Sequence, residues 1–221
     1  VWADYVNAET REQGLVYDAK NLAFILPAGK YIGNSRYKDV FAASAMADLT
    51  SFRNHWGAET SLDVELYRPV ARYELVAKDV ATFLNKLSTG GLKGESFTAR
   101  VKYSDYLPTG YNLWDDVPKN SLMYMEYKVA FERPADGTKE LILGFAYVLT
   151  DAGETVSIPV ELEILNEKNE VLARTAFRIP CERGKNTTVR GNFLTSDANG
   201  GIGIDPDYDG DLEVCLLYTS P

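Results

Sequence analysis

The chain has 221 residues, a formal net charge of -9 and a sequence pI of about 4.8. A surface this acidic repels phosphate backbones, so the composition argues against a nucleic-acid partner. No apolar run reaches the roughly 20 residues of a membrane-spanning helix. The 14 tyrosines and 9 phenylalanines favour strands over helices.

The chain opens on a strand pattern at residues 1–6, without an initiator methionine or a signal peptide. We therefore expect a targeting segment, and the first strands of an N-terminal domain, to precede Val1. A sheet without these strands is predicted to have an open edge near residues 1–6, which would make residues 1–116 the less stable part. A short helix is predicted at residues 39–47 from weak helical periodicity.

Four later segments alternate apolar and polar residues, which is typical of strands with one buried face. They are residues 62–67, 97–103, 123–132 and 156–164, and the first half of residues 183–196 shows the same pattern, with Val189 and Phe193 on one face. Asp79, followed by apolar residues at helical spacing, predicts a helix over residues 79–88 with Asp79 as its N-cap. Residues 141–149 are apolar on both faces and predict a central strand. Pro159 suggests an edge strand or a bulge.

Residues 107–120 contain proline, glycine and aspartate, and they are predicted to connect two domains. We therefore expect an all-β protein with a partial N-terminal β-sandwich domain at 1–116 and a C-terminal one at 117–221. Residues 166–170 are predicted to be the turn of a hairpin. The tail at 215–221 shows no convincing strand pattern.

Few residues in the sequence suggest catalysis. His55 is the only histidine, and nothing near it indicates a nucleophile or a relay. One histidine and two distant cysteines, Cys181 and Cys215, are a poor set of ligands for a zinc site. A disulfide between the two cysteines is an alternative. Asp115 and Asp116 could serve a glycosidase, but a solvated loop is the simpler interpretation. We expect no enzyme activity, no cofactor and no metal.

The acidic loop near the end of the chain is the strongest chemical signal. Asp205, Asp207, Asp209 and Asp211 match the first half of a calcium loop. The closing carboxylate is missing, because that position falls on Leu216. A turn in which aspartates bond their own backbone is the preferred interpretation.

Four aromatic residues gather around residues 107–110 and could form an exposed platform for a glycan. They are Tyr103, Tyr106, Tyr111 and Trp114. The alternative, and the simpler expectation, is that they pack beneath the connecting segment.

Six segments resemble, in order, segments of the fimbrillin-like surface proteins of Bacteroidetes. They are residues 1–6, 39–44, 68–77, 97–113, 179–196 and 202–211. The resemblance implies a transthyretin-like or immunoglobulin-like β-sandwich, usually two in tandem. It also implies export as a lipoprotein and display on the outer membrane, with a lipid anchor upstream of this chain as the only membrane contact.

The same resemblance implies a non-catalytic adhesin or a fimbrial accessory, anchor or tip subunit. The implied partners are other fimbrial subunits or molecules of host and bacterial surfaces. Stalk subunits donate a strand to a neighbour, and we expect the chain after residue 211 to be too short for a spare one. A glycan-binding surface lipoprotein of a polysaccharide-uptake system is the alternative, and a carbohydrate-active enzyme is the second rival.

Overall fold

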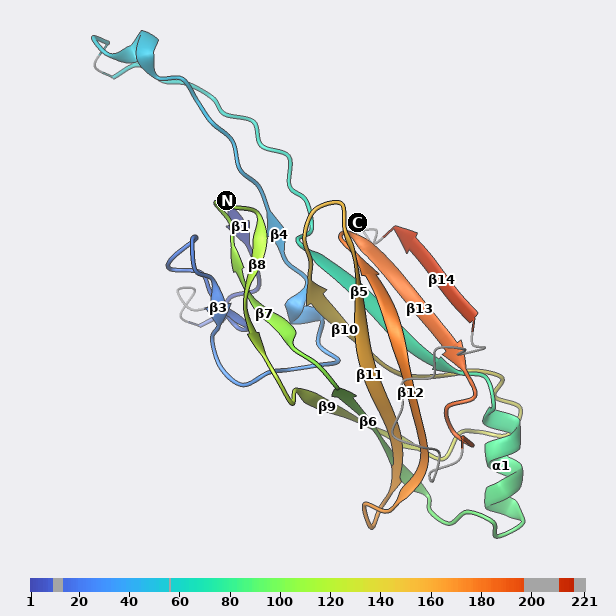
Figure 1. Ribbon diagram of the computed structural model, residues 1–221. Coiled ribbons are helices and arrows are strands. Elements are labelled where there is room, and N and C mark those ends of the chain that lie inside the picture. The colour runs from blue at the N-terminus through green and yellow to red at the C-terminus, as the bar shows by residue number, and fades with distance from the viewer. Residues whose placement is uncertain (10–13, 56, 197–210, 217–221) are drawn as a thin grey trace.

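The protein folds around a β-sandwich of two four-stranded sheets (Figure 1). The structure is a computed structural model that describes residues 1–9, 14–55 and 57–196, and the backbone of 211–216. The predicted all-β sandwich is confirmed. The first sheet has the order β10 (Leu141–Leu149), β5 (Val70–Ala77), β13 (Lys185–Gly191), β14 (Asp211–Leu216), and the second has β12 (Val171–Glu182), β11 (Thr155–Asn166), β6 (Ser96–Tyr103), β9 (Glu126–Glu132).

Strand β5 joins distant parts of the chain within one sheet. It pairs antiparallel with β10 and parallel with β13, where Arg72 lies opposite Asn186. In the second sheet, β6 lies between β11 and β9. Both sheets therefore combine strands from either side of residue 116, and the boundary predicted there does not separate the sheets.

Residues 107–120 form most of a hairpin and not an interdomain connection. Strands β7 (Leu107–Asn112) and β8 (Val117–Leu122) pair antiparallel. Gly110 lies close to Ile25, since a Cβ on it would meet the Ile25 carbonyl oxygen at 2.6 Å. The glycine and the prolines of this segment therefore belong to closely packed strands and not to a linker between domains.

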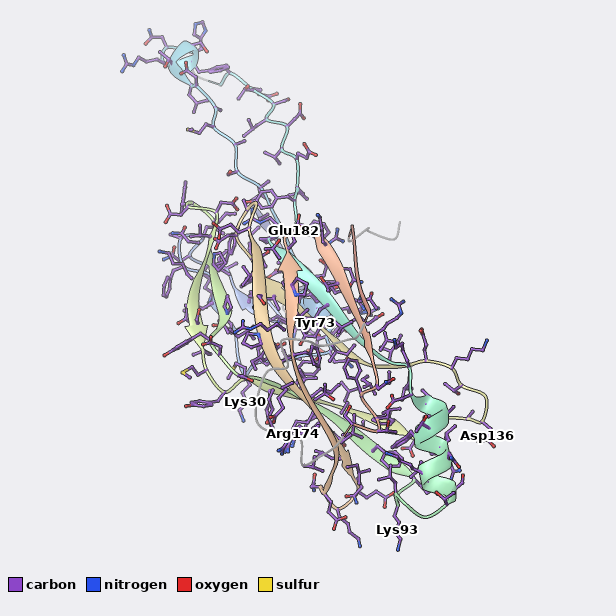
Figure 2. The ribbon with its side chains drawn as sticks, turned by 45° about the vertical axis from the view of Figure 1, so that its right-hand side comes forward. Lys30, Tyr73, Lys93, Asp136, Arg174 and Glu182 are labelled. Atoms are coloured by element: carbon purple, nitrogen blue, oxygen red, sulfur yellow. The ribbon has the colours of Figure 1, made fainter. Side chains whose placement is uncertain are left out.

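The main core fills the space between the two sheets. Strand β6 alternates between half-buried and buried residues along its whole length, as its sequence predicts. Tyr73 lies in this interior (Figure 2) and is fully buried. The rings of Phe177 and Phe193 stack with their centroids 5.3 Å apart. Each large apolar side chain buried here contributes roughly 1.5–3 kcal/mol before chain entropy is subtracted.

The predicted helix is confirmed as α1 (Val80–Ser88), but Asp79 does not cap it with its side chain. The Asp79 carboxylate instead accepts hydrogen bonds from the backbone of Leu194 and from both the backbone and the hydroxyl of Thr195, at 2.7–3.2 Å. This buried carboxylate therefore ties the segment after β13 to the start of the helix.

From Leu143 onward, strand β10 is covered on both faces as predicted, although it lies at the edge of its sheet and not at the centre. One face contributes Ala146 and Val148 to the main core, and the other contributes Tyr147 to a second core. Asn34 covers the open edge, because its N–H donates to the Phe145 carbonyl at 2.9 Å and its side chain accepts from the Phe145 N–H at 3.2 Å.

Pro159 lies in the central strand β11 and at neither an edge nor a bulge. The ladder between β11 and β6 begins only at Val160. The Pro159 carbonyl accepts from the N–H of Ser104 at 3.1 Å. The missing proline N–H therefore costs no ladder hydrogen bond, which explains how a central strand tolerates it. The hairpin turn predicted at 166–170 is confirmed between β11 and β12.

Residues 1–9 and 14–42 form an N-terminal layer over β7 and β10, with the second core beneath it. The strand predicted at 1–6 is shorter than expected, and the helix predicted at 39–47 is wrong. Ala42 bridges to both Trp2 and Tyr67, which holds this segment extended. The layer contains β1 (Trp2–Ala3), β2 (Tyr17–Asp18), β3 (Leu26–Pro27), the 3-10 helix η1 (Arg36–Lys38) and β4 (Phe41–Ala42).

The tail also differs from expectation, since β14 runs through Cys215 to Leu216. Its backbone pairs with β13 from Lys185 to Arg190. The open edge of β13 offers backbone partners to a segment whose side-chain pattern alone does not specify a strand.

The close approach of Gly33 to Tyr127 yields a stability prediction. The Gly33→Ala substitution is expected to destabilise the protein by about 1–3 kcal/mol, because the added Cβ would lie 2.1 Å from Tyr127 Cγ in the main core. Gly29→Ala is the matched control, since no atom lies within 4 Å of its Cβ position. Urea unfolding followed by tyrosine fluorescence measures both, and equal midpoints would contradict the packing described.

Candidate functional site

Residues 44–55 and 57–66 leave the body in a long two-legged projection, named the arm here (Figure 1, cyan). Its base is closed by the bridge between Ala42 and Tyr67 and by the Val1 ammonium, which donates to the Ala43 carbonyl at 2.7 Å. The 3-10 helix η2 (Thr50–Phe52) forms its far end. Every described residue of the arm is exposed except Phe52, which is half-buried.

The returning leg of the arm contains the segment predicted as a strand at 62–67, and that prediction is wrong. Only Tyr67 is paired, since no described strand lies beside the rest. Leu62, Val64 and Leu66 are exposed at 53%, 37% and 47%. The alternation is nevertheless the pattern of a half-buried strand. The arm therefore presents apolar side chains and backbone groups that another chain could cover.

The arm also carries further exposed apolar residues and several acidic groups. Met46 is fully exposed, and Leu49 is 59% exposed. The charged residues of the arm are Asp48, Arg53, Glu59, Asp63 and Glu65, so its carboxylates outnumber its one arginine. This surface is suited to an apolar partner groove with basic residues at its rim.

The base of the arm is held by a cluster of polar contacts around Arg183. The Arg183 guanidinium donates to Asp116 at 2.8 Å, to the Tyr111 hydroxyl at 2.7 Å and to the Thr150 carbonyl at 2.9 Å. The Tyr67 hydroxyl donates to the same Asp116 carboxylate, and the guanidinium lies 5.2 Å from the centroid of the Tyr67 ring. One cation thus connects the arm, the β7–β8 hairpin and the end of β10.

The titration behaviour of this cluster follows from its contacts. Burial by itself would raise the pKa of Asp116, but hydrogen bonds from Tyr111, Tyr67 and Arg183 outweigh it and lower that pKa. Burial and the Asp116 carboxylate raise the pKa of Tyr67 to about 12. Asp116 is therefore charged and each hydroxyl is protonated at neutral pH, as the hydrogen bonds require.

The structure does not bring the four predicted aromatic residues together. Tyr103 is buried in the main core, where its hydroxyl lies 2.6 Å from that of Tyr73, and Tyr111 is buried in the second core. Tyr106 and Trp114 are exposed at 61% and 77%, but they flank opposite ends of β7, roughly 20 Å apart for a six-residue strand.

The most exposed aromatic ring near this hairpin is one that the sequence interpretation did not select. Tyr124 is 85% exposed and follows β8, while Tyr106 precedes β7. Leu107 pairs with Leu122, so both tyrosines lie at the same end of the hairpin. In the sequence, Tyr124 lies on the polar side of the alternating segment 123–132, and this position is the signal that indicated its exposure.

The remaining predicted sites divide into described and undescribed residues. His55 is exposed near the end of the arm, and no group of three metal-ligating side chains occurs among the described residues. Cys181 is a free thiol, and burial raises its pKa to about 12. Asp205, Asp207 and Asp209 lie outside the described residues, as does the side chain of Asp211.

Both carboxylates of the acidic pair Asp115–Asp116 accept hydrogen bonds from other side chains of the fold. Asp115 accepts from the Asn112 side chain at 2.5 Å, and Asp116 accepts from Arg183 and two tyrosines. Neither carboxylate of the pair faces the other across a pocket in the described structure, as a glycosidase would need.

A family model matches residues 1–218, and the chain belongs to that family, which is a family of unknown function (DUF6562). The function of this family is unknown, so the fimbrillin resemblance stays a prediction. A comparison with curated proteins found no match. In the described part of the chain, no helix is both long enough and apolar enough to cross a membrane.

Solved structures show only a distant likeness. A proposed cell adhesion protein from Bacteroides ovatus is 12% identical, with a TM-score of 0.40 over 72% of this chain and 49% of that one. Similar proposed adhesion proteins from Bacteroides eggerthii and Parabacteroides distasonis are 10% and 11% identical, each with a TM-score of 0.34. They cover 69% and 68% of this chain, which spans 57% and 52% of theirs.

The Arg183 cluster leads to a prediction about the base of the arm. Arg183→Met is expected to destabilise the protein by about 2–3 kcal/mol, because Asp116 and the Thr150 carbonyl lose their shared donor. Hydrogen exchange at the Tyr67 amide, which donates to Ala42 at 2.9 Å, should also become faster. Arg178→Met is the control, since Arg178 is exposed. Unchanged exchange at Tyr67 would show that the cluster does not hold the arm.

A second prediction concerns the outer face of the second sheet, where Glu163 is fully buried beneath three cations. Burial by itself would raise its pKa, but hydrogen bonds from Lys102, Arg100 and Arg174 lower it to about 2. The folded-state pKa lies below the unfolded one, so this stabilisation is present above about pH 4.5 and is lost as the pH falls toward 2.

Glu163→Gln should therefore lower the unfolding free energy by roughly 2–3 kcal/mol at pH 7 and flatten its dependence on pH between 4.5 and 2. Urea unfolding at several pH values tests this. The exposed Glu154, replaced by Gln, is the control. If the unfolding free energy of Glu163→Gln changed with pH in parallel with that of the wild type, the role of Glu163 and its three cations would be refuted.

Proposed function

We propose that the protein is a non-catalytic adhesion module of the bacterial surface, and that the arm is its binding element. The observation that carries this proposal is the projection of the described residues of the arm away from the body, with apolar side chains exposed. Exposed apolar groups on an extended segment cost solubility unless a partner covers them. The fimbrillin resemblance supports an accessory, anchor or tip subunit as the finer assignment.

The proposed partner chemistry follows from the returning leg. Leu62, Val64 and Leu66 share one side, and Asp63 and Glu65 take the other. A strand of this pattern adds to the exposed edge of a partner's sheet, where backbone hydrogen bonds supply affinity and side-chain pockets supply specificity. The acidic side selects a groove with basic residues beside it.

The Arg183 cluster, which lies at the base of the arm, also supports this role. A binding element transmits force only if its foot is fixed to the body. Tyr67, the residue that follows the returning leg, is held by Asp116 and lies beside the Arg183 guanidinium. The arm is thus anchored in a rigid part of the fold, although its own residues are solvated.

Removing the arm tests the proposal directly. Ala42 and Tyr67 are bridged, so residues 44–65 can be replaced by a two-residue Asn-Gly turn without separating the ends. Beads coated with the intact protein are expected to adhere to Bacteroidetes cells or to epithelial monolayers at least ten-fold more than beads coated with the armless variant. Equal adhesion of both proteins, or none by the intact one, would refute the proposal.

Point variants separate the two sides of the returning leg. The triple variant Leu62→Ser, Val64→Ser, Leu66→Ser should lose most adhesion, and its melting temperature should stay within about 2 °C of the wild type because these side chains are exposed. The double variant Asp63→Asn, Glu65→Gln is the matched control and should weaken adhesion less, mainly at low salt. Greater loss in the double variant would assign the contact to charge.

Glycan binding by a surface lipoprotein is the second candidate function, favoured by the exposed rings of Tyr106 and Tyr124 at one end of the β7–β8 hairpin. Such rings can stack on sugar faces. A glycan array distinguishes the candidates, since binding that disappears in a Tyr106→Ala, Tyr124→Ala variant and persists in the armless one would favour this function.

A further inference from the structure

An open hollow of about 260 Å³ lies on the outer face of the second sheet, where β6 ends and β9 begins, apart from the arm. Its charged lining comes from three neighbouring strands, with Lys102 on β6, Glu126 on β9 and Glu161 on β11. Tyr124 and Ser104 also line it. Pockets for drug-sized ligands measure roughly 300–1,000 Å³, so this hollow has room for one small ring and not for an extended ligand.

The three charged residues stand in one row across the sheet, named the polar row here. Lys102 lies opposite Glu161 on one side and opposite Glu126 on the other. Adjacent strands are about 4.8 Å apart, so the polar row presents an acceptor, a donor and an acceptor at that spacing. A ligand rich in hydroxyls can match it, since every hydroxyl both donates and accepts.

Each member of the polar row keeps capacity for a further hydrogen bond. The Lys102 ammonium contacts Glu161 at 3.0 Å and Glu163 at 2.9 Å, which uses two of its three N–H groups. Glu161 accepts with Oε1, and its Oε2 has no partner among the described residues. The Glu126 side chain is 46% exposed, and its described ion-pair partner, Lys128, lies 3.9 Å away.

Tyr124, beside the polar row, has a backbone conformation that tyrosine rarely adopts. Its φ is 59°, whereas the other four non-glycine residues with positive φ in the described chain are asparagine or aspartate. This left-handed region costs a bulky residue free energy that asparagine or glycine largely avoids. The ring is 85% exposed, so core packing does not account for a tyrosine here. Strained residues of this kind are found preferentially at binding sites.

We propose that the hollow is a subsite for one neutral hexopyranose ring. The Tyr124 ring packs on the C–H face of the sugar, and the polar row hydrogen-bonds its hydroxyls. Two carboxylates repel an acidic sugar, and Lys102 between them disfavours an amine, which leaves a neutral polyol. This inference rests on the second candidate function, glycan binding, and it does not depend on the arm.

NMR titration of the full chain tests the site with three neutral probes, methyl β-glucoside, methyl β-galactoside and methyl α-mannoside, each added alone. The amide signals of Lys102, Tyr124 and Glu126 should shift saturably with at least one probe. The dissociation constant is expected on the order of 1–10 mM, as for a single open subsite. Absence of a saturable shift with all three probes would overturn the subsite.

Methyl β-glucuronide tests the choice of a neutral sugar. It carries a carboxylate where the glucoside has a hydroxymethyl group, and it should bind at least ten-fold more weakly than the neutral probe that binds best, because Glu126 and Glu161 repel it. Binding of the glucuronide as tight as that of the neutral probe would overturn the neutral assignment.

Two variants test the residues of the hollow. Tyr124→Gly accepts the same φ without a ring and should weaken binding at least ten-fold, whereas Tyr124→Phe should bind as the wild type does. Glu126→Gln should weaken binding about five-fold, since an amide has one acceptor oxygen and no charge. Glu132→Gln, at the other end of β9, is the matched control. Unchanged binding by Tyr124→Gly or Glu126→Gln would overturn the site.

Both substituted side chains are exposed, so each variant should melt within about 2 °C of the wild type, and a loss of binding then reports contact and not unfolding. Tyr106→Ala separates the subsite from the wider glycan function, because Tyr106 does not line the hollow. Tyr106→Ala should bind the neutral probe as the wild type does. Array binding that disappears in Tyr106→Ala, Tyr124→Ala while no neutral probe binds would overturn the subsite and leave glycan binding standing.

Discussion

The ion pair between Arg183 and Asp116 is the contact on which the arrangement of the outer parts depends. Arg183 follows β12 and reaches the Thr150 carbonyl at the end of β10, the hydroxyl of Tyr111 and the carboxylate of Asp116. Through Asp116 it also fixes Tyr67 at the foot of the arm. A planar guanidinium with several fixed donors can join these groups at once, which a lysine could not do.

The sandwich gives this cluster a rigid support. Parallel pairing of β5 with β13 places the strand that follows the arm against a strand from the end of the chain. The second core then packs the N-terminal layer on β10 through Tyr17, Ile25 and Tyr147. The body is therefore held by long-range contacts, whereas the arm between Ala42 and Tyr67 depends on the body for its position.

The arm differs from the rest of the fold in one physical respect. It exposes apolar groups that its own fold leaves uncovered, which is a local imbalance in an otherwise well-packed protein. Such a surface points to a macromolecular partner.

The sequence by itself determined the local elements whose signal is periodic, since alternation identified β6 and β11 and helical spacing identified α1. It could not assign partners, because pairing such as Arg72 with Asn186 joins residues far apart in the chain. Alternation at 62–67 indicated a strand, yet among the described residues only Tyr67 of this segment is paired. Only the tertiary structure decided that Tyr103 is buried, that Tyr124 is exposed and that Lys38 lies inside, because burial depends on which segments pack together.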